Sequence, residues 1–597
     1  MSEHPISNFA AAERGHSRWQ AALFFGKAWV FRARRMLAER SGERPHPLAR
    51  EPLSKDGALL AESRAELYSS VLPAEFSLQA GKVHNLRTAV AKLNGLIIPA
   101  GGEFSFWANV GMPVRGRGFV EGREMREGCI VPSVGGGLCQ LSNALYDAAL
   151  LADCEITERH AHSRRLPGSM AEVGRDATVF WNYVDLRFRT RMACRLEARL
   201  TRNELIVRLH SVGALAVGEA AGPSVSPTAR GNGEMPLPQP QPAAAVESCE
   251  TCGIASCFRH IEAGSSPTHG VTAWLVDGWW PEFDAYLRTH RQHGDWLCTP
   301  LDSVRLHLGP YRWDSKGFAR VRQAPLEVLQ RSLVSRRLAA QGAARQLALL
   351  RFDEALARRY ARVLPSEGTH LVVSQNILPF LWRNGILGGR TFDVLMTRLP
   401  LAELEATLDR AHAAHPHSRT LADFRADHSL LADENAALAE ARYWITPHSG
   451  IAQLAGSRAR KLEWVLPHSS RRVAAGNNIA FPTSTLGRKG AYELREVARL
   501  LGLRVKLGGP VIEDTGFWNG VETVPAGESW LAQAAAVVLP AWVENQPRRL
   551  LQAVAAGIPV IASDACGLAD VPGVMVVAAG NASALAAALE AVSRKSD

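Results

Sequence analysis

The sequence lacks any apolar run long enough to cross a membrane. A spanning helix needs about 18 consecutive apolar residues, and no such run occurs in the 597 residues. The opening MSEHPISNFAAAERGHSRW also lacks the basic-then-apolar pattern of an export signal. No segment combines aromatic and basic residues like a nucleic-acid-binding module. We therefore expect a cytoplasmic protein that has no nucleic-acid partner.

Cysteine is also scarce, with nine residues in the whole chain. Without an export signal, these cysteines are expected in a reducing compartment, as free thiols or metal ligands rather than as disulfides. The formal net charge is +10 and is spread along the chain. This charge is compatible with contact with anionic lipid, polyphosphate or nucleotide, and it selects none of them.

The length is too great for one hydrophobic core and predicts several domains. Residues 217–247 are rich in Pro, Ala, Gly and Ser, which predicts an extended linker. The expected segments follow in chain order: an amphipathic or irregular extension (1–60), an α+β domain (61–215), a linker (216–247), a cysteine-rich knuckle (248–262) and two α/β lobes (268–470 and 471–597).

The N-terminal extension contains a short apolar stretch at residues 20–31. Lys27 interrupts it, and Arg32, Arg34 and Arg35 follow it. A helix of this kind can lie on the anionic inner face of a membrane as a peripheral contact. Alternatively, it can dock against its own protein, and the sequence leaves both interpretations open.

A cysteine stands directly after three glycines in the first domain. Residues 135–142 read GGGLCQLS, and a helical pattern follows over 142–152. A thiol at the start of a helix is favoured as thiolate by the helix dipole. His160 and His162 lie downstream, so the segment predicts a Cys–His nucleophilic pair. The alternative is a buried structural cysteine under a glycine turn.

Separated motifs over residues 85–189 resemble the VanW family, which is named from glycopeptide-resistance clusters. The matching pieces follow in order: Asn85-Leu86, PAGGEFSF at 99–106, Gly111, GGGLCQLS, ERHAHS at 158–163 and GRDAT at 174–178. The resemblance implies Cys-dependent acyl transfer on cell-wall peptides. We predict Cys139 as nucleophile and His162 as its base. Asp176 could orient the imidazole, and Gln140 could donate to an oxyanion.

A cluster of metal-ligand residue types follows the linker. Cys249, Cys252, Cys257 and His260 have the spacing C-x2-C-x4-C-x2-H, which supplies enough ligands for a closed structural zinc site. An iron–sulfur ligand set and a cysteine-rich loop without metal are the alternatives.

The second half of the chain alternates strand and helix patterns. Apolar strands such as 371–374, 392–396 and 537–539 are separated by helical segments, including 325–363 and 401–414. This alternation predicts two tandem α/β lobes with parallel sheets and a ligand cleft. Strands are also predicted over 179–189, in the first domain, and over 462–466.

The last lobe resembles retaining GT-B glycosyltransferases of group 1, the twin Rossmann-like class. Arg488 and Lys489, in GRKG at 487–490 after Phe481-Pro482, resemble the loop that holds the donor pyrophosphate. The segments LPAWVENQP (539–547), LLQA (550–553) and GIPVIAS (557–563) resemble the donor-sugar motif. The family has two glutamates here, one facing the transferred sugar and one on the ribose. Glu544 keeps the first, and Gln552 stands where the second is expected, so a weaker neutral contact replaces a carboxylate.

The resemblances imply a hexosyltransferase-like enzyme of bacterial cell-envelope biosynthesis. Its donor would be a nucleotide-diphosphate sugar and its acceptor an envelope glycan or lipid-linked molecule. Two alternatives remain: a Cys139-dependent acyl transferase acting on peptidoglycan peptides, and a non-catalytic scaffold with a degenerate lobe. Asp277, His448 and Ser449 are weaker acceptor-side candidates.

Overall fold

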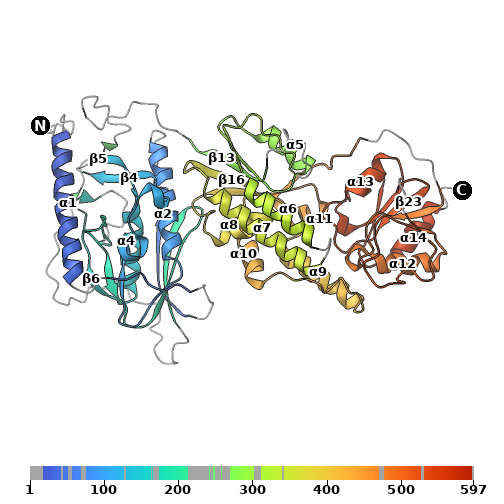
Figure 1. Ribbon diagram of the computed structural model, residues 1–597, viewed down its shortest axis with the longest axis horizontal. Coiled ribbons are helices and arrows are strands. Elements are labelled where there is room, and N and C mark those ends of the chain that lie inside the picture. Colours follow the sequence, from blue (N-terminus) through green and yellow to red (C-terminus); the bar gives the residue numbers. More distant parts are fainter. Residues whose placement is uncertain are drawn as a thin grey trace, which may run out of the picture. The chain divides into compact units, whose positions relative to one another are not determined.

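The computed structural model describes residues 18–41, 45–51, 57–68, 75–126, 129–162, 164–165, 174–212, 241–242, 247–248, 257, 269–301, 311–338, 342–468, 476–525 and 530–593. The chain divides into two compact units, whose elements are labelled in Figure 1. The first unit comprises Met1–Val271, Pro365–Thr369 and Gly385–Arg390. The second comprises Thr272–Leu364, His370–Asn384 and Thr391–Asp597. Within the described residues, no helix has the length and apolar character needed to span a bilayer.

The first unit is built on a four-stranded antiparallel sheet in the order β1-β10-β9-β2. Its strands are β1 (Leu59–Glu66), β10 (Glu204–Ser211), β9 (Cys194–Leu200) and β2 (Leu96–Ile98). Alternate residues of β10, including Leu205, Val207 and Leu209, are buried in a core that α2 (Phe76–Leu93) and α4 (Leu138–Leu151) complete. The period-2 burial of one sheet face is what the alternating sequence predicts.

Smaller elements surround this core and position the candidate thiol. A β4–β5 hairpin precedes α4 in the chain, and strands β6 and β8, which follow α4, form a three-stranded sheet with the earlier β3 in the order β3-β8-β6. The remaining elements of the unit are α1 (Arg18–Ser41), β3 (Glu103–Ser105), α3 (Phe106–Val110), β4 (Glu121–Arg126), β5 (Cys129–Val134), β6 (Glu155–Glu158), β7 (Arg164–Arg165), β8 (Arg187–Arg189), β11 (Gln241–Pro242) and β12 (Glu247–Ser248). The unit is therefore α+β, as the sequence predicts.

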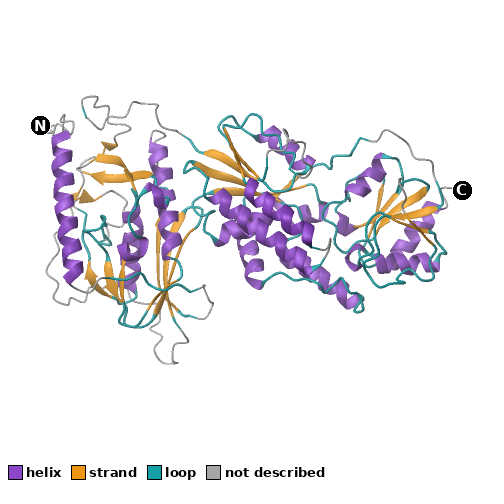
Figure 2. Ribbon diagram, in the orientation of Figure 1, coloured by secondary structure: helices purple, strands orange, loops and turns teal. Residues whose placement is uncertain are grey.

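The second unit contains two parallel α/β lobes, each with helices packed beside its sheet (Figure 2). The first lobe has the strand order β15-β14-β13-β16-β17-β18-β19. Its strands are β13 (Val271–Leu275), β14 (Trp296–Thr299), β15 (Arg320–Gln323), β16 (Gly368–Ser374), β17 (Thr391–Leu395), β18 (Trp444–Thr446) and β19 (Ala459–Lys461). Its helices are α5 (Pro281–His290), α6 (Pro325–Arg337), α7 (Ala343–Ala361), α8 (Leu378–Arg383), α9 (Leu401–Ala414), α10 (His428–Glu440) and α11 (Ser449–Ala455).

The second lobe has a six-stranded sheet in the order β22-β21-β20-β23-β24-β25, with every neighbouring pair parallel. Its elements are β20 (Asn478–Phe481), α12 (Ala491–Leu500), β21 (Val505–Leu507), β22 (Thr523–Pro525), β23 (Ala534–Leu539), α13 (Arg548–Ala555), β24 (Val560–Ser563), β25 (Val574–Val577) and α14 (Ala582–Ser593). Strand β21 lies on one side of β20, and β23 lies on its other side. The order therefore reverses between β20 and β23, which is where doubly wound sheets bind ligands.

Two local predictions were wrong. The predicted strand over 179–189 is reduced to β8, and Phe180 and Val184 instead form an isolated antiparallel bridge. The predicted strand at 462–466 is irregular, and the sheet ends with β19. The helical prediction over 325–363 is confirmed by two packed helices, α6 and α7.

Most of the predicted linker lies outside the described residues. Its described pieces, β11 and β12, pair in parallel with β7 and β5 of the first unit. Of the predicted zinc ligands, Cys249, Cys252 and His260 also lie outside the described residues, and Cys257 is a half-buried free thiol. Within the described part of the chain, no group of three or more His, Cys, Asp or Glu side chains could hold a metal ion.

Candidate functional sites

The predicted thiol stands in the first turn of α4. Helix α4 starts at Leu138, four residues earlier than the helical pattern indicates, so Cys139 is its second residue. Its N-cap, Gly137, has a φ of 97°, and an added Cβ would collide with the Lys82 side chain. Only glycine fits such a left-handed, crowded position without strain. The glycine run thus brings the thiol to the positive end of a helix, where a thiolate is favoured.

The structure brings Cys139, His162 and Asp176 together, and we call these three residues the thiol site. His162 lies close enough to the Cys139 thiol for the two groups to shift each other's pKa. Its Nδ1 contacts the Asp176 carboxylate. The other Asp176 oxygen accepts the His162 backbone N–H at 2.6 Å. Asp176 is buried, so its carboxylate fixes the imidazole on both the ring and the main chain.

The charges of the thiol site favour an ion pair. Burial alone would raise the pKa of Cys139, but the hydrogen bond and charge of His162 outweigh it and lower that pKa. Burial alone would likewise lower the pKa of His162, but hydrogen bonds to Asp176 and Cys139 raise it to about 10. Both shifts favour thiolate and imidazolium over the neutral pair.

Residues near Asp176 tie it to α4. Asn143 on α4 accepts the Ala177 N–H at 2.8 Å, and the Arg159 guanidinium donates to the Asp176 carbonyl at 2.7 Å. Thr178 places its hydroxyl 3.5 Å from the Cys139 sulfur. Sequence reasoning missed Thr178 as a thiol neighbour, although it belongs to the GRDAT motif.

Two other nearby residues lie differently from the prediction. His160 is exposed and its ring faces Glu158 at 3.4 Å, so only one of the two histidines contacts the thiol. The Gln140 side-chain amide donates to the Glu66 carbonyl at 2.6 Å. That bond directs the amide to strand β1 rather than to the sulfur, so the expected oxyanion donor is engaged elsewhere.

The second lobe has a cavity of about 310 Å³ at its strand-order reversal. Loops leaving β20, β21 and β23 line it, together with the start of α13. The lining residues are Pro482, Thr483, Ser484, Gly508, Gly509, Pro510, Leu539, Glu544, Gln546, Pro547, Arg548, Arg549 and Leu550. We call this space the donor cavity, after the donor that the sequence predicts for this lobe.

Glu544 lines the donor cavity and is paired with a lysine. Lys489 Nζ lies 2.9 Å from the Glu544 carboxylate and donates to the Val543 carbonyl at 3.1 Å. Both side chains are largely buried, at 15% and 13% exposure. The predicted phosphate-side cation and sugar-side carboxylate therefore meet directly, although Lys489 itself does not line the cavity.

Main-chain contacts also hold the basic loop in place. The Arg488 carbonyl accepts the N–H groups of Trp542 and Val543 at 3.0 and 3.1 Å, and burial lowers the pKa of its guanidinium. The buried Glu513 carboxylate accepts the Gly487 N–H at 2.8 Å. Gly490, with a φ of 74°, packs so closely on the Pro540 carbonyl that a Cβ would clash. The GRKG loop is thus fixed against the loop that carries Glu544.

Gln552 does not reach the donor cavity. It is exposed on α13, while its neighbours Leu551 and Ala553 face the core. Arg549, which sequence reasoning missed, does line the cavity and donates to the Pro482 and Gly508 carbonyls at 2.6 and 2.7 Å. The Gly508-Gly509 pair, directly after the apolar residues that form β21, was a readable signal for this wall.

The weaker candidates lie in the first lobe. Asp277 follows β13, where that sheet also reverses its strand order, and accepts from Asn376 at 2.8 Å. His448 is buried and caps α11, with its Nδ1 accepting the Ile451 N–H at 3.3 Å. Its Nε2 lies 3.2 Å from the Ala565 carbonyl. Ser449 N–H donates to Gly567 O at 3.1 Å.

Comparison with known proteins identifies two regions. Residues 81–210 match the model described as VanW like protein, and residues 462–595 match glycosyl transferases group 1. The vancomycin B-type resistance protein VanW of Enterococcus faecalis is 32% identical over 149 residues, which are 24% of this chain and 54% of that protein. The uncharacterized protein YoaR of Bacillus subtilis is 29% identical over 158 residues, 26% of this chain and 52% of that protein. The chain spans about half the length of these curated relatives.

Solved structures resemble the second half. A sucrose-phosphate synthase from Thermosynechococcus elongatus is 13% identical with a TM-score of 0.33, covering 55% of this chain and 90% of that chain. The HepE protein of Anabaena in complex with UDP-glucose is 12% identical with a TM-score of 0.31, covering 55% of this chain and 91% of that chain. These scores are low, and it is their own strand order that shows the lobes to be doubly wound α/β sheets. The chain thus carries a VanW-like domain at residues 81–210 and a group 1 glycosyl transferase domain at residues 462–595.

Proposed function

We propose that the second unit transfers a sugar from a nucleotide-diphosphate donor to an envelope glycan or a lipid-linked acceptor. The observation that supports this most directly is the donor cavity at the reversal point of the second sheet, with Glu544 on its wall. Ligands of doubly wound sheets bind outside the carboxyl ends of the strands at this point.

The lining groups suit a diphosphate and a sugar. The loops at 482–484 and 508–510 offer hydroxyl and backbone groups, and Arg549 supplies a cation at the same wall. A bound diphosphate would give Lys489 a second anionic partner, which would free Glu544 oxygens for sugar hydroxyls. During transfer, the bond from the anomeric carbon to the diphosphate would break while the bond to the acceptor oxygen forms, and the acceptor hydroxyl would give its proton to the departing diphosphate. Lys489 and Arg549 are then the cations that would stabilise the charge on the leaving diphosphate.

The proposal is tested by titrating the full chain with UDP, GDP and ADP in a calorimeter. Lys489→Ala should weaken the best binder by about 1.5–3 kcal/mol, the scale of a charged hydrogen bond, or about 10- to 150-fold. Arg504→Ala is the matched control, because Arg504 forms an exposed ion pair with Glu522 in the same lobe, outside the cavity lining. If none of the three nucleotides binds, the transferase proposal is refuted and the non-catalytic scaffold remains as the alternative.

Glu544→Gln separates binding from turnover. It should keep donor affinity within a few-fold while lowering donor hydrolysis or transfer by about 100-fold or more, if the carboxylate acts on the sugar in the transition state. Turnover unchanged in this variant would remove Glu544 from the proposed site.

We propose a second function for the first unit, which is supported by the position of Cys139 at the start of α4 beside the His162–Asp176 pair. The Cys139 thiolate would attack a peptide carbonyl, and the leaving amine would take a proton from the His162 imidazolium. An acceptor amine would then attack the thioester, losing its proton to His162 and releasing Cys139. Asp176 would keep the imidazole oriented throughout.

Intact-protein mass after incubation with muropeptides tests this step. The expected adduct equals the peptide acyl group without its leaving amine, formed on the full chain and on Cys154→Ala but not on Cys139→Ala. Equal adducts on Cys139→Ala would contradict the assignment.

A further inference from the structure

Helix α1 is anchored to the first unit through one narrow face. Ala28 is 3% exposed, and Phe24 packs edge-on against Phe180 with ring centres 6.0 Å apart. Arg32 donates to the Trp181 carbonyl at 2.7 Å. These contacts recur every four residues, so they come from one side of the helix.

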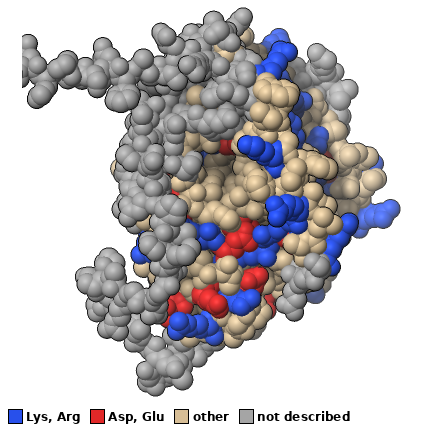
Figure 3. Space-filling model, turned by 90° about the vertical axis from the view of Figure 1, so that its left-hand side faces the viewer, with Lys and Arg blue, Asp and Glu red and all other residues tan. Residues whose placement is uncertain are grey.

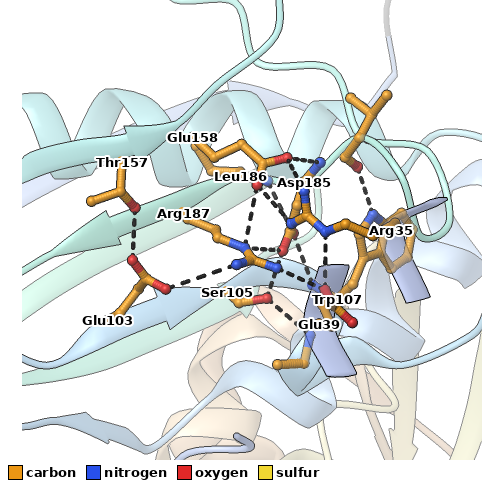
Figure 4. A network of polar contacts seen from close by, with 12 residues as sticks. Arg35, Glu39, Glu103, Ser105, Trp107, Thr157, Glu158, Asp185, Leu186 and Arg187 are labelled. Atoms are coloured by element: carbon orange, nitrogen blue, oxygen red, sulfur yellow. Dashed lines mark hydrogen bonds and ion pairs between the residues drawn. The ribbon is translucent and has the colours of Figure 1, made fainter. Parts of the chain in front are cut away.

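The anchoring continues in a polar network, shown in Figure 4. Arg35 pairs with Glu158 at 2.7 Å, and Glu39 pairs with Arg35 and Arg187, each at 3.0 Å. Arg187 is also bonded to Asp185 at 2.9 Å. The docked face of α1 is therefore fixed by both packing and charge.

The opposite face of α1 is apolar and exposed. Trp19, Leu23 and Val30 are 72%, 48% and 51% exposed, and they project away from the Ala28 side because 3.6 residues make one turn. Trp29 and Met36 flank them at 69% and 52% exposure. A helix already docked on its protein normally turns polar groups to water. This face instead presents two tryptophans and several aliphatic side chains.

The charges beside this face have a single sign. Arg18, Lys27, Arg34 and Arg40 are exposed. Glu39, the one acidic residue among the described residues of α1, lies on the docked face. Figure 3 shows this side of the molecule, where basic side chains are scattered among uncharged ones and most acidic side chains gather lower down. The surface therefore combines apolar and cationic groups.

We propose that this face of α1 lies flat on an anionic lipid bilayer. Tryptophans favour the boundary between hydrocarbon and headgroups, and arginine and lysine beside them contact anionic headgroups. A second copy of the chain fits less well, since two such faces would bring cations together without acidic partners. Because the docked and lipid-facing sides are opposite, α1 binds lipid without leaving the unit. The proposal does not depend on either proposed reaction.

Flotation of the full chain with vesicles tests the proposal. Vesicles of phosphatidylcholine with about 30% phosphatidylglycerol should bind the chain, and pure phosphatidylcholine vesicles should bind at least about tenfold less. Trp19→Glu/Val30→Glu and, separately, Lys27→Glu/Arg34→Glu should each lower binding at least about tenfold. These positions are exposed, and circular dichroism checks that the variants fold.

The matched control lies on α6, where Leu326 and Leu333 are 71% and 50% exposed. Leu326→Glu/Leu333→Glu should leave vesicle binding unchanged. Absence of flotation, or loss in the α6 variant with none in the α1 variants, overturns the proposal. So does a dimer in sedimentation velocity that the α1 variants abolish while vesicles fail to bind.

Discussion

Replacing Asp176 by asparagine should suppress the reactivity of Cys139. The pKa of His162 stands at about 10 against an ordinary value of about 6.5, which corresponds to about 5 kcal/mol in favour of the imidazolium. Burial opposes this shift, and hydrogen bonds and charges of Asp176 and Cys139 produce it. Removing the Asp176 charge should remove about half of this free energy, about 2–3 kcal/mol. The equilibrium constant for the thiolate–imidazolium pair over the neutral pair should then fall about 30- to 150-fold.

The assay is peptide-resolved iodoacetamide labelling between pH 6 and 9. In the native chain, Cys139 should label readily near pH 6.5, because its pKa is lowered. Cys154 and Cys194 should not, since burial raises their pKa values to about 12 and about 11. In Asp176→Asn, Cys139 labelling near pH 6.5 should drop at least about tenfold and rise steeply with pH.

Two further variants guard against a folding artefact. His162→Gln removes the imidazolium while leaving Asp176 able to accept the backbone N–H of residue 162, and it should lower labelling similarly. His160→Ala, at the exposed neighbouring histidine, should change nothing. If Cys139 labels no faster than Cys154 or Cys194 in the native chain, it is a packed thiol and His162 does not activate it.

The remaining predictions concern stability and metal. Burial alone would raise the pKa of Glu158, but hydrogen bonds from His160 and Arg35 and nearby arginine charges lower it to about 2. The contribution of the ionised Glu158 to the stability of the folded state is therefore fully present above pH 4.5 and is lost as the pH falls toward 2. Glu158→Gln should lower the free energy of unfolding by about 1–3 kcal/mol at neutral pH, as measured by denaturant unfolding. An unchanged unfolding midpoint would show that contacts other than those of Glu158 anchor α1. The chain purified without chelator should carry about one zinc, lost in Cys257→Ser; no metal, or iron with charge-transfer bands, would contradict the knuckle.

The thiol site could be predicted because its residues carry local signals. A glycine run directly before a helical pattern places the cysteine at a helix start, and the motif residues His162 and Asp176 follow in order. The same logic gave α9 its observed bounds, since amphipathic spacing and a preceding proline mark both its face and its start. Local chemistry was sufficient in both cases.

Tertiary packing decided the predictions that failed. The aromatic run after residue 179 alternates like a strand, yet Phe180 packs on Phe24 of α1 and Trp181 on Trp107. Those ring contacts replace a strand ladder and involve residues far away in the chain, which no local pattern reveals. The pairing of Gln140 with Glu66 has the same origin, because the partner is on a distant strand.

The departure at Gln552 has a physical consequence for the donor cavity. Arg548 and Arg549 begin α13 at the cavity, with Gln552 one turn further on. Arg548 is neutralised by Glu282 at 2.7 Å, and Lys489 by Glu544. Arg549, bonded only to carbonyls in the described residues, leaves one positive charge in excess.

A glutamate at position 552 would cancel that excess near the same wall. The neutral amide preserves it, so attraction for a diphosphate should survive at this end even where the contact with a ribose weakens. Gln552→Glu should therefore not tighten binding of inorganic pyrophosphate. If the exposed side chain reaches a bound ribose, the same variant should tighten UDP, GDP or ADP relative to pyrophosphate. If calorimetry finds the ratio of nucleotide affinity to pyrophosphate affinity unchanged in this variant, position 552 takes no part in donor recognition. The exposure of Gln552 on α13 indicates this outcome.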